Sequence, residues 1–193
     1  MATNRIFSVF SGRTQPGQVL RKILIFTSWL PAVIFFNGNV GQIATINGES
    51  MYPYLNTSYN ESLSRDKCWV NKLNPAGNLN RGMLVTFRSP SNPEFMAVKR
   101  VIAIEGDRVF PRAPYPAPVV DIPAGHVWVE GDNRDGKKTL DSNHYGPISA
   151  SLIQGKVTHV IWPWKSFGAV RWWEFKARTR VIQGRRENAF HFG

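Results

Sequence analysis

The sequence is poor in cysteine and lacks the common catalytic signatures. Its one cysteine, Cys68, cannot form an internal disulfide, and no group of cysteines and histidines has the spacing of a zinc site. The G-x-S-x-G, HExxH, GxGxxG and P-loop patterns are also missing. We therefore expect neither a metal nor a cofactor, and any chemistry has to be inferred from less common patterns.

Acidic residues are missing from the beginning of the chain, where none precedes Glu49. The same stretch carries four basic residues: Arg5, Arg13, Arg21 and Lys22. An arginine-bearing, hydroxyl-rich and acid-free composition is typical of a mitochondrial presequence. It also fits a short basic tail beside a membrane span, and the two interpretations are compatible. Residues 1–22 are therefore interpreted as a basic N-terminal segment.

The formal net charge of +11 allows two kinds of partner, a nucleic acid or an anionic membrane surface. The excess is concentrated in the N-terminal segment and in the aromatic-rich tail, residues 171–193. Because no aromatic signature of RNA binding is visible, we expect a membrane and no nucleic acid. A basic β-barrel that binds nucleic acid is the non-enzymatic alternative. The tail is interpreted either as a solvated terminal helix or as a helix on the membrane surface.

Residues 23–46 contain no charged side chain and are long enough to cross a bilayer as a helix. One proline and an Asn-Gly-Asn run weaken the pattern, but spanning helices tolerate proline and glycine. A basic pair, Arg21 and Lys22, flanks the segment on its N-terminal side. The sequence thus predicts a single transmembrane helix over residues 23–46, with everything after it in the compartment opposite to the N-terminus.

Short runs rich in valine, isoleucine and aromatic residues follow, separated by clusters of proline, glycine and asparagine. They occupy Met83–Phe87, Phe95–Ile104, His126–Glu130 and Lys156–Ile161. Residues 111–125 are proline-rich and cannot form a central strand. The expected fold class is mainly β: an N-terminal transmembrane helix followed by a compact antiparallel β domain over residues 47–170.

Three segments of this predicted domain carry residues capable of chemistry. In Gly48–Pro53, Ser50 lies near a glycine that permits unusual backbone angles and the close approach of a substrate chain. In Phe95–Ile104, strand alternation places Lys99 on one face among alanine and valine. Burial lowers a lysine pKa, and a neutral amine can act as a general base; a lysine that reaches water from an edge strand is the alternative. Residues 130–147 are dense in Gly, Asp and Asn, as in a hydrogen-bonded loop.

Together these segments resemble the signal peptidase I family, and within it the mitochondrial inner-membrane peptidase branch. The resemblance covers roughly residues 20–168 and rests on four stretches in the family's order. These are Ser50-Met51-x-Pro53-x-Leu55, residues 81–87 (RGMLVTF), Lys99–Ile102 with Gly106-Asp107, and Gly131–Asn133 with residues 141–147 (DSNHYGP). The Asp-Ser-Asn and Gly-Pro-Ile-Ser sequences look like subunit 2 of that branch, which implies a heterodimer with the other subunit.

The resemblance implies a serine protease with Ser50 as nucleophile and Lys99 as general base. It also implies an oxyanion donor in the backbone N–H of Ser50, whereas the hydroxyl that bacterial members carry two positions earlier is replaced by Gly48. Thr139 stands where the family has a hydroxyl that orients the lysine amine. Because the loop is longer here than in relatives, Ser142 is the competing candidate for that role.

A further ion pair is expected from the same resemblance. Relatives carry an arginine close in sequence to the residue that corresponds to Asp141, but here that position is Asn143. Strand alternation puts Arg100 on the face opposite Lys99, so it is free to leave the active site. We therefore expect Asp141 to pair with Arg100.

The substrates implied by the resemblance are precursor proteins with cleavable sorting presequences, bound as extended chains beside the strand of Lys99. Small side chains are expected at the first and third positions before the cut. The implied location is the mitochondrial inner membrane, with a single span and the catalytic domain in the intermembrane space. The other interpretations are a bacterial-type signal peptidase, a catalytically silent subunit that stabilises its partner, and a self-cleaving repressor, which the predicted span argues against.

Overall fold

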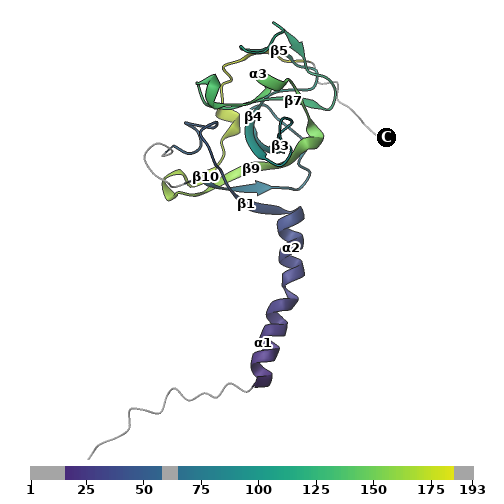
Figure 1. The fold of residues 1–193 in the computed structure, drawn as a ribbon, viewed down its shortest axis with the longest axis vertical. Coiled ribbons are helices and arrows are strands. Elements are labelled where there is room, and N and C mark those ends of the chain that lie inside the picture. The colour runs from purple at the N-terminus through teal and green to yellow at the C-terminus, as the bar shows by residue number, and fades with distance from the viewer. Residues whose placement is uncertain (1–15, 58–64, 185–193) are drawn as a thin grey trace, which may run out of the picture.

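The computed structural model describes residues 16–57 and 65–184, and joins a helical column to a β domain (Figure 1). The column contains two helices in line, α1 (Pro16–Ser28) and α2 (Leu30–Asn39). Pro31 stands in the first turn of α2 and has no backbone N–H, so it cannot continue the hydrogen-bond ladder of α1. Residues 1–15 of the predicted basic segment lie outside the described residues.

The segment long and apolar enough to cross a membrane is Gly17–Asn39, with a mean hydropathy of 1.7 and no part buried against the rest of the described chain. This segment begins and ends earlier than the predicted range of residues 23–46. The basic pair at 21 and 22 lies inside α1, and the chain leaves the helix after Asn39 to form strand β1 (Gly41–Thr45). An uncharged run does not distinguish helix from strand, and here pairing with a neighbouring strand decides the conformation after Asn39.

The helical column is tied to the β domain by several contacts. Strand β2 (Lys67–Asn71) pairs antiparallel with β1. Phe36 of α2 and Trp69 of β2 lie with their ring centroids 6.2 Å apart. The backbone N–H of Lys72 donates to the Val40 carbonyl at 2.9 Å, and its amine donates to a carbonyl in the last turn of α2 at 3.0 Å. The end of α2 is therefore fixed against β1 and β2.

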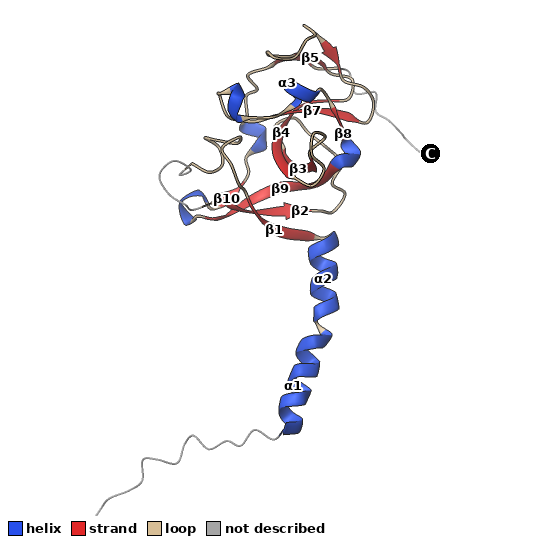
Figure 2. Cartoon of the chain, in the orientation of Figure 1, coloured by secondary structure: helices blue, strands red, loops and turns tan. Residues whose placement is uncertain are grey.

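Within the described residues, antiparallel pairing builds an eight-stranded curled sheet in the order β1-β2-β9-β3-β4-β7-β8, with β10 beside β9 (Figure 2). Its other strands are β3 (Leu84–Arg88), β4 (Met96–Ile104), β7 (His126–Glu130), β8 (Ile148–Ser149), β9 (Ile153–Trp162) and β10 (Gly168–Ala169). Strands β3, β4, β7 and β9 correspond to the predicted β runs. The predicted fold class, a mainly β domain behind an N-terminal apolar helix, is confirmed.

Three apolar clusters form the core of the described domain, and two of them lie on opposite faces of β3. Alternation along β3 puts Leu84 in one cluster and Val85 in the other. The first cluster also takes in Met51 and Leu55, which are 1% and 0% exposed and come from the loop after β1. Burying a side chain of this type contributes about 2 kcal/mol. These two anchors therefore hold the loop that carries Ser50 against the sheet.

A smaller three-stranded sheet, in the order β11-β5-β6, lies at the end of the domain far from the helices (Figure 1). Its strands are β5 (Arg108–Phe110), β6 (Val120–Asp121) and β11 (Arg180–Ile182). The proline-rich residues 111–125 contribute only β6, a short strand at the edge. Short helical turns complete the described domain: η1 (Gly136–Lys138), α3 (Ser142–Tyr145), η2 (Ala150–Leu152), η3 (Trp164–Ser166) and η4 (Trp172–Glu174).

The tail differs from both interpretations of the sequence over its described part, residues 171–184. It contains the single turn η4 and strand β11, and neither a solvated terminal helix nor a helix on a membrane face. The reason is local pairing, because β11 bonds to β5 and joins the small sheet. The domain therefore continues to residue 184, past the predicted boundary at 170. Residues 185–193 lie outside the described residues.

Candidate active site

Ser50 lies in the loop after β1, residues 46–57, which is called here the serine loop. Its neighbours fix the shape of that loop. Gly48 has a φ of +85°, which glycine adopts without strain. The side-chain amide of Asn56 donates to the carbonyls of Ile46 and Gly48, each at 2.8 Å. These bonds close the loop on itself, while the buried side chain of Met51 pins it to the sheet.

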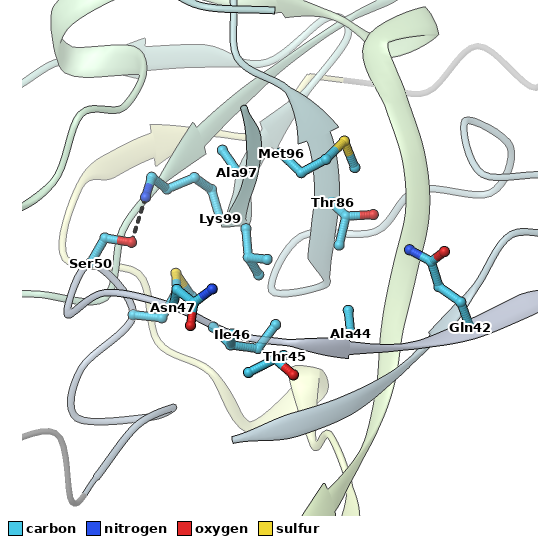
Figure 3. Close-up of a pocket in the computed structure, with 12 residues that line it drawn as sticks. Gln42, Ala44, Thr45, Ile46, Asn47, Ser50, Thr86, Met96, Ala97 and Lys99 are labelled. Atoms are coloured by element: carbon cyan, nitrogen blue, oxygen red, sulfur yellow. Dashed lines mark hydrogen bonds between the residues drawn. The ribbon is translucent and has the colours of Figure 1, made fainter. Parts of the chain in front are cut away.

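The structure brings the two predicted catalytic residues together. Lys99 lies on β4, opposite Val85 of β3, and its side chain is directed toward the Ser50 loop (Figure 3). Its Nζ is 2.6 Å from Oγ of Ser50, a hydrogen-bonding distance. Lys99 is only 5% exposed, so the alternative of a lysine that reaches water is not the geometry found here.

Burial lowers the pKa of Lys99 from 10.5 to about 8. Removal of water from the ammonium is the dominant cause, and the negative charges of Asp141 and Asp132 oppose it without cancelling it. A pKa of about 8 leaves roughly one amine in ten neutral at pH 7 and most of them neutral above pH 9. A neutral amine has a lone pair that can accept the Ser50 hydroxyl proton.

The loop after β7 supports the nucleophile from behind. The backbone N–H of Asn133 donates to the Ser50 carbonyl at 3.0 Å, and its side-chain amide donates to the Glu49 carbonyl at 2.8 Å. Gly131 leaves no space for a side chain, because a Cβ there would lie 2.2 Å from Oγ1 of Thr139 and 2.6 Å from the Ser50 carbonyl. The sequence singles out Gly131–Asn133 as a family stretch, but nothing in it shows that the Asn133 amide reaches the serine loop.

Thr139 lies beside this loop, but its hydroxyl has a different partner from the predicted one. Its Oγ1 donates to Oδ2 of Asp141 at 3.0 Å, and no hydrogen bond joins it to Lys99 anywhere in the described parts of the chain. The predicted direct bond to Lys99 is therefore absent from this geometry, in which the Thr139 hydroxyl is held by the buried carboxylate of Asp141. The competing candidate, Ser142, is also occupied elsewhere, since its hydroxyl accepts from the Val129 backbone N–H at 3.0 Å.

The predicted ion pair between Asp141 and Arg100 is also wrong. Arg100 makes a two-pronged pair with Asp132, with Nε–Oδ1 and Nη2–Oδ2 distances of 2.8 and 2.5 Å, and donates to the Gly82 carbonyl at 2.8 Å. Asp141 instead accepts hydrogen bonds from its own loop, including the backbone N–H of Gly131 at 3.0 Å. Arg100 lies directly opposite Glu130 at the end of β7, so the next residues of the loop bring Asp132 to it first.

A pocket of about 180 Å³ opens beside the serine and the lysine (Figure 3). Its walls come from β1 and the turn after it on one side, and from β3 and the first half of β4 on the other. The lining residues are Gln42, Ala44, Thr45, Ile46, Asn47, Ser50, Met51, Thr86, Met96, Ala97, Val98 and Lys99. In the described sheet β1 pairs only with β2, and residues 96–99 pair only with β3, because β7 joins β4 at Arg100. Two open strand edges therefore border the pocket, and each can pair with an extended peptide.

Among the described residues no group of three histidine, cysteine or acidic side chains is placed to hold a metal ion. The charged side chain among the residues that line the pocket is Lys99, and its amine bonds to the Ser50 hydroxyl. What remains for chemistry at this site is the contact between a hydroxyl and an amine of lowered pKa.

Comparisons with known proteins identify the family of the chain. The sequence pattern of the family described as "Signal peptidase, peptidase S26" matches residues 19–114. The chain is 40% identical to mitochondrial inner membrane protease subunit 2 of Saccharomyces cerevisiae over 77% of this chain and 84% of that protein. It is 36% identical to the protein of that name from Schizosaccharomyces pombe, over 86% and 89% of the two chains.

Subunit 1 of the same protease from Mus musculus is 37% identical over 68% of this chain and 76% of that protein. Among solved structures, a signal peptidase I from Enterococcus faecalis is 20% identical, with a TM-score of 0.37, and is matched over 42% of this chain and 97% of that chain. The extent and identity of the sequence matches assign the family. The chain belongs to the signal peptidase family, peptidase S26, in the branch of the mitochondrial inner membrane proteases.

Proposed function

We propose that this chain is a membrane-anchored serine endopeptidase in which Ser50 is the nucleophile and Lys99 the general base. The observation that carries the proposal is the 2.6 Å contact between the Ser50 hydroxyl and a buried amine of lowered pKa. An alcohol is a poor nucleophile at neutral pH unless an adjacent base takes its proton. A serine–lysine pair is a known variant of that arrangement.

The proposed reaction follows from the geometry of the pair. Oγ of Ser50 attacks the carbonyl carbon of the scissile bond while its proton passes to Nζ of Lys99. The backbone N–H of Ser50, which donates to no other group in the described residues, receives the developing oxyanion. Lys99 then gives the proton to the leaving amine. Finally, the neutral amine of Lys99 deprotonates a water molecule, and this water hydrolyses the acyl-enzyme.

The substrate is proposed to be an extended peptide that pairs with the open edges of β1 and β4. Backbone hydrogen bonds at a strand edge bind a chain independently of its sequence, while pockets select alternate side chains. The expectation of small residues at the first and third positions before the cut is carried over from the resemblance to the signal peptidase family. We infer from the resemblance to the signal peptidase family, and from relatives named as mitochondrial inner membrane proteases, that these peptides are sorting presequences of proteins delivered to the mitochondrial intermembrane space.

The test uses the full chain purified in detergent and a precursor protein that carries a sorting presequence. The wild type should cut the precursor at one site, and Ser50→Ala should lose the activity. Ser91→Ala, at an exposed serine in the turn between β3 and β4, is the matched control and should cut normally. Equal cleavage by wild type and Ser50→Ala would contradict the proposed chemistry.

The proposed topology places the domain, from β1 onward, in the intermembrane space, with Gly17–Asn39 across the inner membrane. The basic residues Arg21 and Lys22, near the N-terminal end of that segment, support this orientation. Protease added to mitoplasts should digest the domain. Protection in mitoplasts, with digestion only after full lysis, would reverse the orientation.

Relatives named subunit 1 and subunit 2 support a heterodimer with a second peptidase subunit. The presequence-cleavage test should therefore be repeated with material that co-purifies from mitochondria with an affinity-tagged chain. If a partner carries the whole activity, Ser50→Ala will leave the activity of the complex unchanged. That result would assign the chain the role of a silent, stabilising subunit.

A further inference from the structure

Residues 172–184, called here the C-terminal strap, cross the back of the active site. At its start, the Trp172 carbonyl closes over Gly82, where a Cβ would lie 2.2 Å from that carbonyl oxygen. At its end, β11 pairs with β5, and the Gly184 N–H donates to Asp107 at 2.9 Å. The strap is thus held at both ends by contacts that do not involve the active site.

Between these two ends, Arg178 reaches the loop that supports the nucleophile. Its Nη2 lies 3.3, 3.0 and 3.0 Å from the carbonyl oxygens of Gly131, Asp132 and Asn133. The next residue, Thr179, is buried and donates to the carboxylate of Glu130, at 2.7 and 2.8 Å from its two oxygens. The whole turn from 130 to 133 is therefore bonded to two consecutive strap residues.

This turn is the one that bonds to the serine loop. Asn133 donates through its backbone to the Ser50 carbonyl and through its side chain to the Glu49 carbonyl. A rotation of the turn would move both donors, and with them the peptide that carries the Ser50 side chain. Arg178 is thus linked to Ser50 through this turn, although no contact joins the two residues in the described structure.

The strap also approaches the serine loop from its other side. The ring of Phe175 lies 4.1 Å from the Arg100 guanidinium carbon, and the ring of Tyr54, from the serine loop, lies 4.5 Å from the same carbon. The Arg171 N–H, just before the strap, donates to the Tyr54 hydroxyl at 3.2 Å. The serine loop is therefore bracketed by contacts that originate in the C-terminal segment.

We propose that Arg178 is a positioning residue for the Ser50–Lys99 reaction, acting through the carbonyls of residues 131–133. The inference rests on the proposed function. Arg178 is exposed and bonds to carbonyls rather than to a carboxylate, so its removal leaves no unpaired buried charge. Because other contacts hold both ends of the strap, its removal should loosen the turn without unfolding the domain.

The test compares Arg178→Ala, Arg178→Lys and the control Lys176→Ala, at an exposed cation of the same strap. In the full chain, Arg178→Ala should lower kcat for presequence cleavage about tenfold, because a small misplacement of a reacting group reduces the rate steeply. KM, the midpoint of the pH profile and the thermal unfolding midpoint should stay near the wild-type values. Arg178→Lys keeps donors within reach of the carbonyls and should recover most of kcat. Lys176→Ala should behave as wild type.

Two results would overturn the inference. The first is an unchanged kcat in Arg178→Ala. The second is a loss of kcat that accompanies a fall in the thermal unfolding midpoint, because Arg178 would then have only a structural role. Ser50→Ala, measured in the same assay, separates this failure from a failure of the proposed function. If Ser50→Ala is inactive and Arg178→Ala is normal, only the positioning role is lost. If Ser50→Ala remains active, both proposals fail.

Discussion

Lys99 and Arg100 are consecutive buried cations on β4 that face opposite sides of the sheet and lie in opposite surroundings. Lys99 is 5% exposed, and its amine has one hydrogen bond within the described structure, to Ser50. Arg100 is 0% exposed, and a carboxylate, a backbone carbonyl and two aromatic rings surround its guanidinium. One strand thus holds a titratable amine and a permanent cation side by side.

The difference shows that burial alone does not determine whether a basic side chain keeps its charge. A buried guanidinium with a two-pronged carboxylate partner stays charged and links the elements around it. Removal of water from a buried amine disfavours its charged form, and this lowers the pKa of Lys99. The nearby carboxylates, which form no hydrogen bond with the amine, raise its pKa only in part. Strand alternation is sufficient to send the two side chains to these two environments.

The largest expected effect comes from replacing the titratable amine by a permanent cation. Lys99→Arg should be as inactive as Lys99→Ala, because arginine does not give up its proton in a protein. Both should lose at least about 10³-fold in kcat/KM, the scale seen when a nucleophile–base unit is broken. Initial rates of presequence cleavage measure the loss. An active Lys99→Arg enzyme would remove Lys99 from the mechanism.

Substitution by methionine should affect stability in opposite directions at the two positions. Arg100→Met leaves Asp132 buried without its partner and should lower the free energy of unfolding by about 3–5 kcal/mol. Lys99→Met removes an amine whose pKa is about 8 when folded and near 10.5 when unfolded, which corresponds to about 3 kcal/mol of destabilisation removed at pH 7. Denaturant titrations of the full chain in detergent measure both changes.

The sign of the pH dependence follows from the lowered pKa. Between about pH 8 and 10.5 the unfolded chain binds more protons at Lys99 than the folded chain does, so wild-type stability should rise with pH across that range. The advantage of Lys99→Met should therefore be largest below pH 8 and disappear near pH 10.5. An advantage that stays constant with pH would show that it comes from packing rather than from the charge.

A smaller effect is expected on the pH profile of the enzyme. The kcat/KM of the wild type should rise with pH around a midpoint near pH 8 and level off above about pH 9, where most of Lys99 is neutral. Because the charge of Asp141 raises the Lys99 pKa, Asp141→Asn should shift the midpoint to lower pH, whatever it does to the maximum rate. A midpoint that moves to higher pH, or a flat profile, would contradict a lysine base.

The smallest effects concern the two hydroxyls of the loop. Thr139→Val deletes the hydrogen bond to Asp141 beside the Ser50 carbonyl and should lower turnover roughly tenfold, while Thr139→Ser should be nearly silent. Ser142→Ala deletes the bond from Val129 and should cost about 1 kcal/mol of stability with little change in turnover. Turnover of the variants, measured side by side, shows which of the two hydroxyls matters for the reaction. The reverse pattern would show that Ser142 is the orienting hydroxyl.

Much of the fold could be predicted because it depends on local pattern. The valine- and isoleucine-rich runs identify β3, β4, β7 and β9, and alternation along β4 correctly separates Lys99 from Arg100. Strand β1 could not be predicted, because its residues are as uncharged as the helix before them. Its conformation depends on pairing with β2, a contact between segments far apart in the chain.

The site shows the same division between local and distant information. Resemblance to a family is sufficient to nominate Ser50 and Lys99, which the structure brings to 2.6 Å. Which carboxylate meets Arg100 depends on the register of β7 against β4, and the sequence does not show that register. The role proposed for Arg178 depends on the path of the strap, for which a basic and aromatic composition gives no signal.

The fixed junction between α2 and the first two strands limits how far the enzyme can reach. The Lys72 bonds and the contact between Phe36 and Trp69 hold the end of α2 against the domain. Strand β1 continues from that junction and forms part of the pocket wall. If the helix is embedded in a bilayer, the active site stays at one height above the membrane surface. The enzyme would then cut only those bonds that a substrate presents at that fixed distance from the membrane surface.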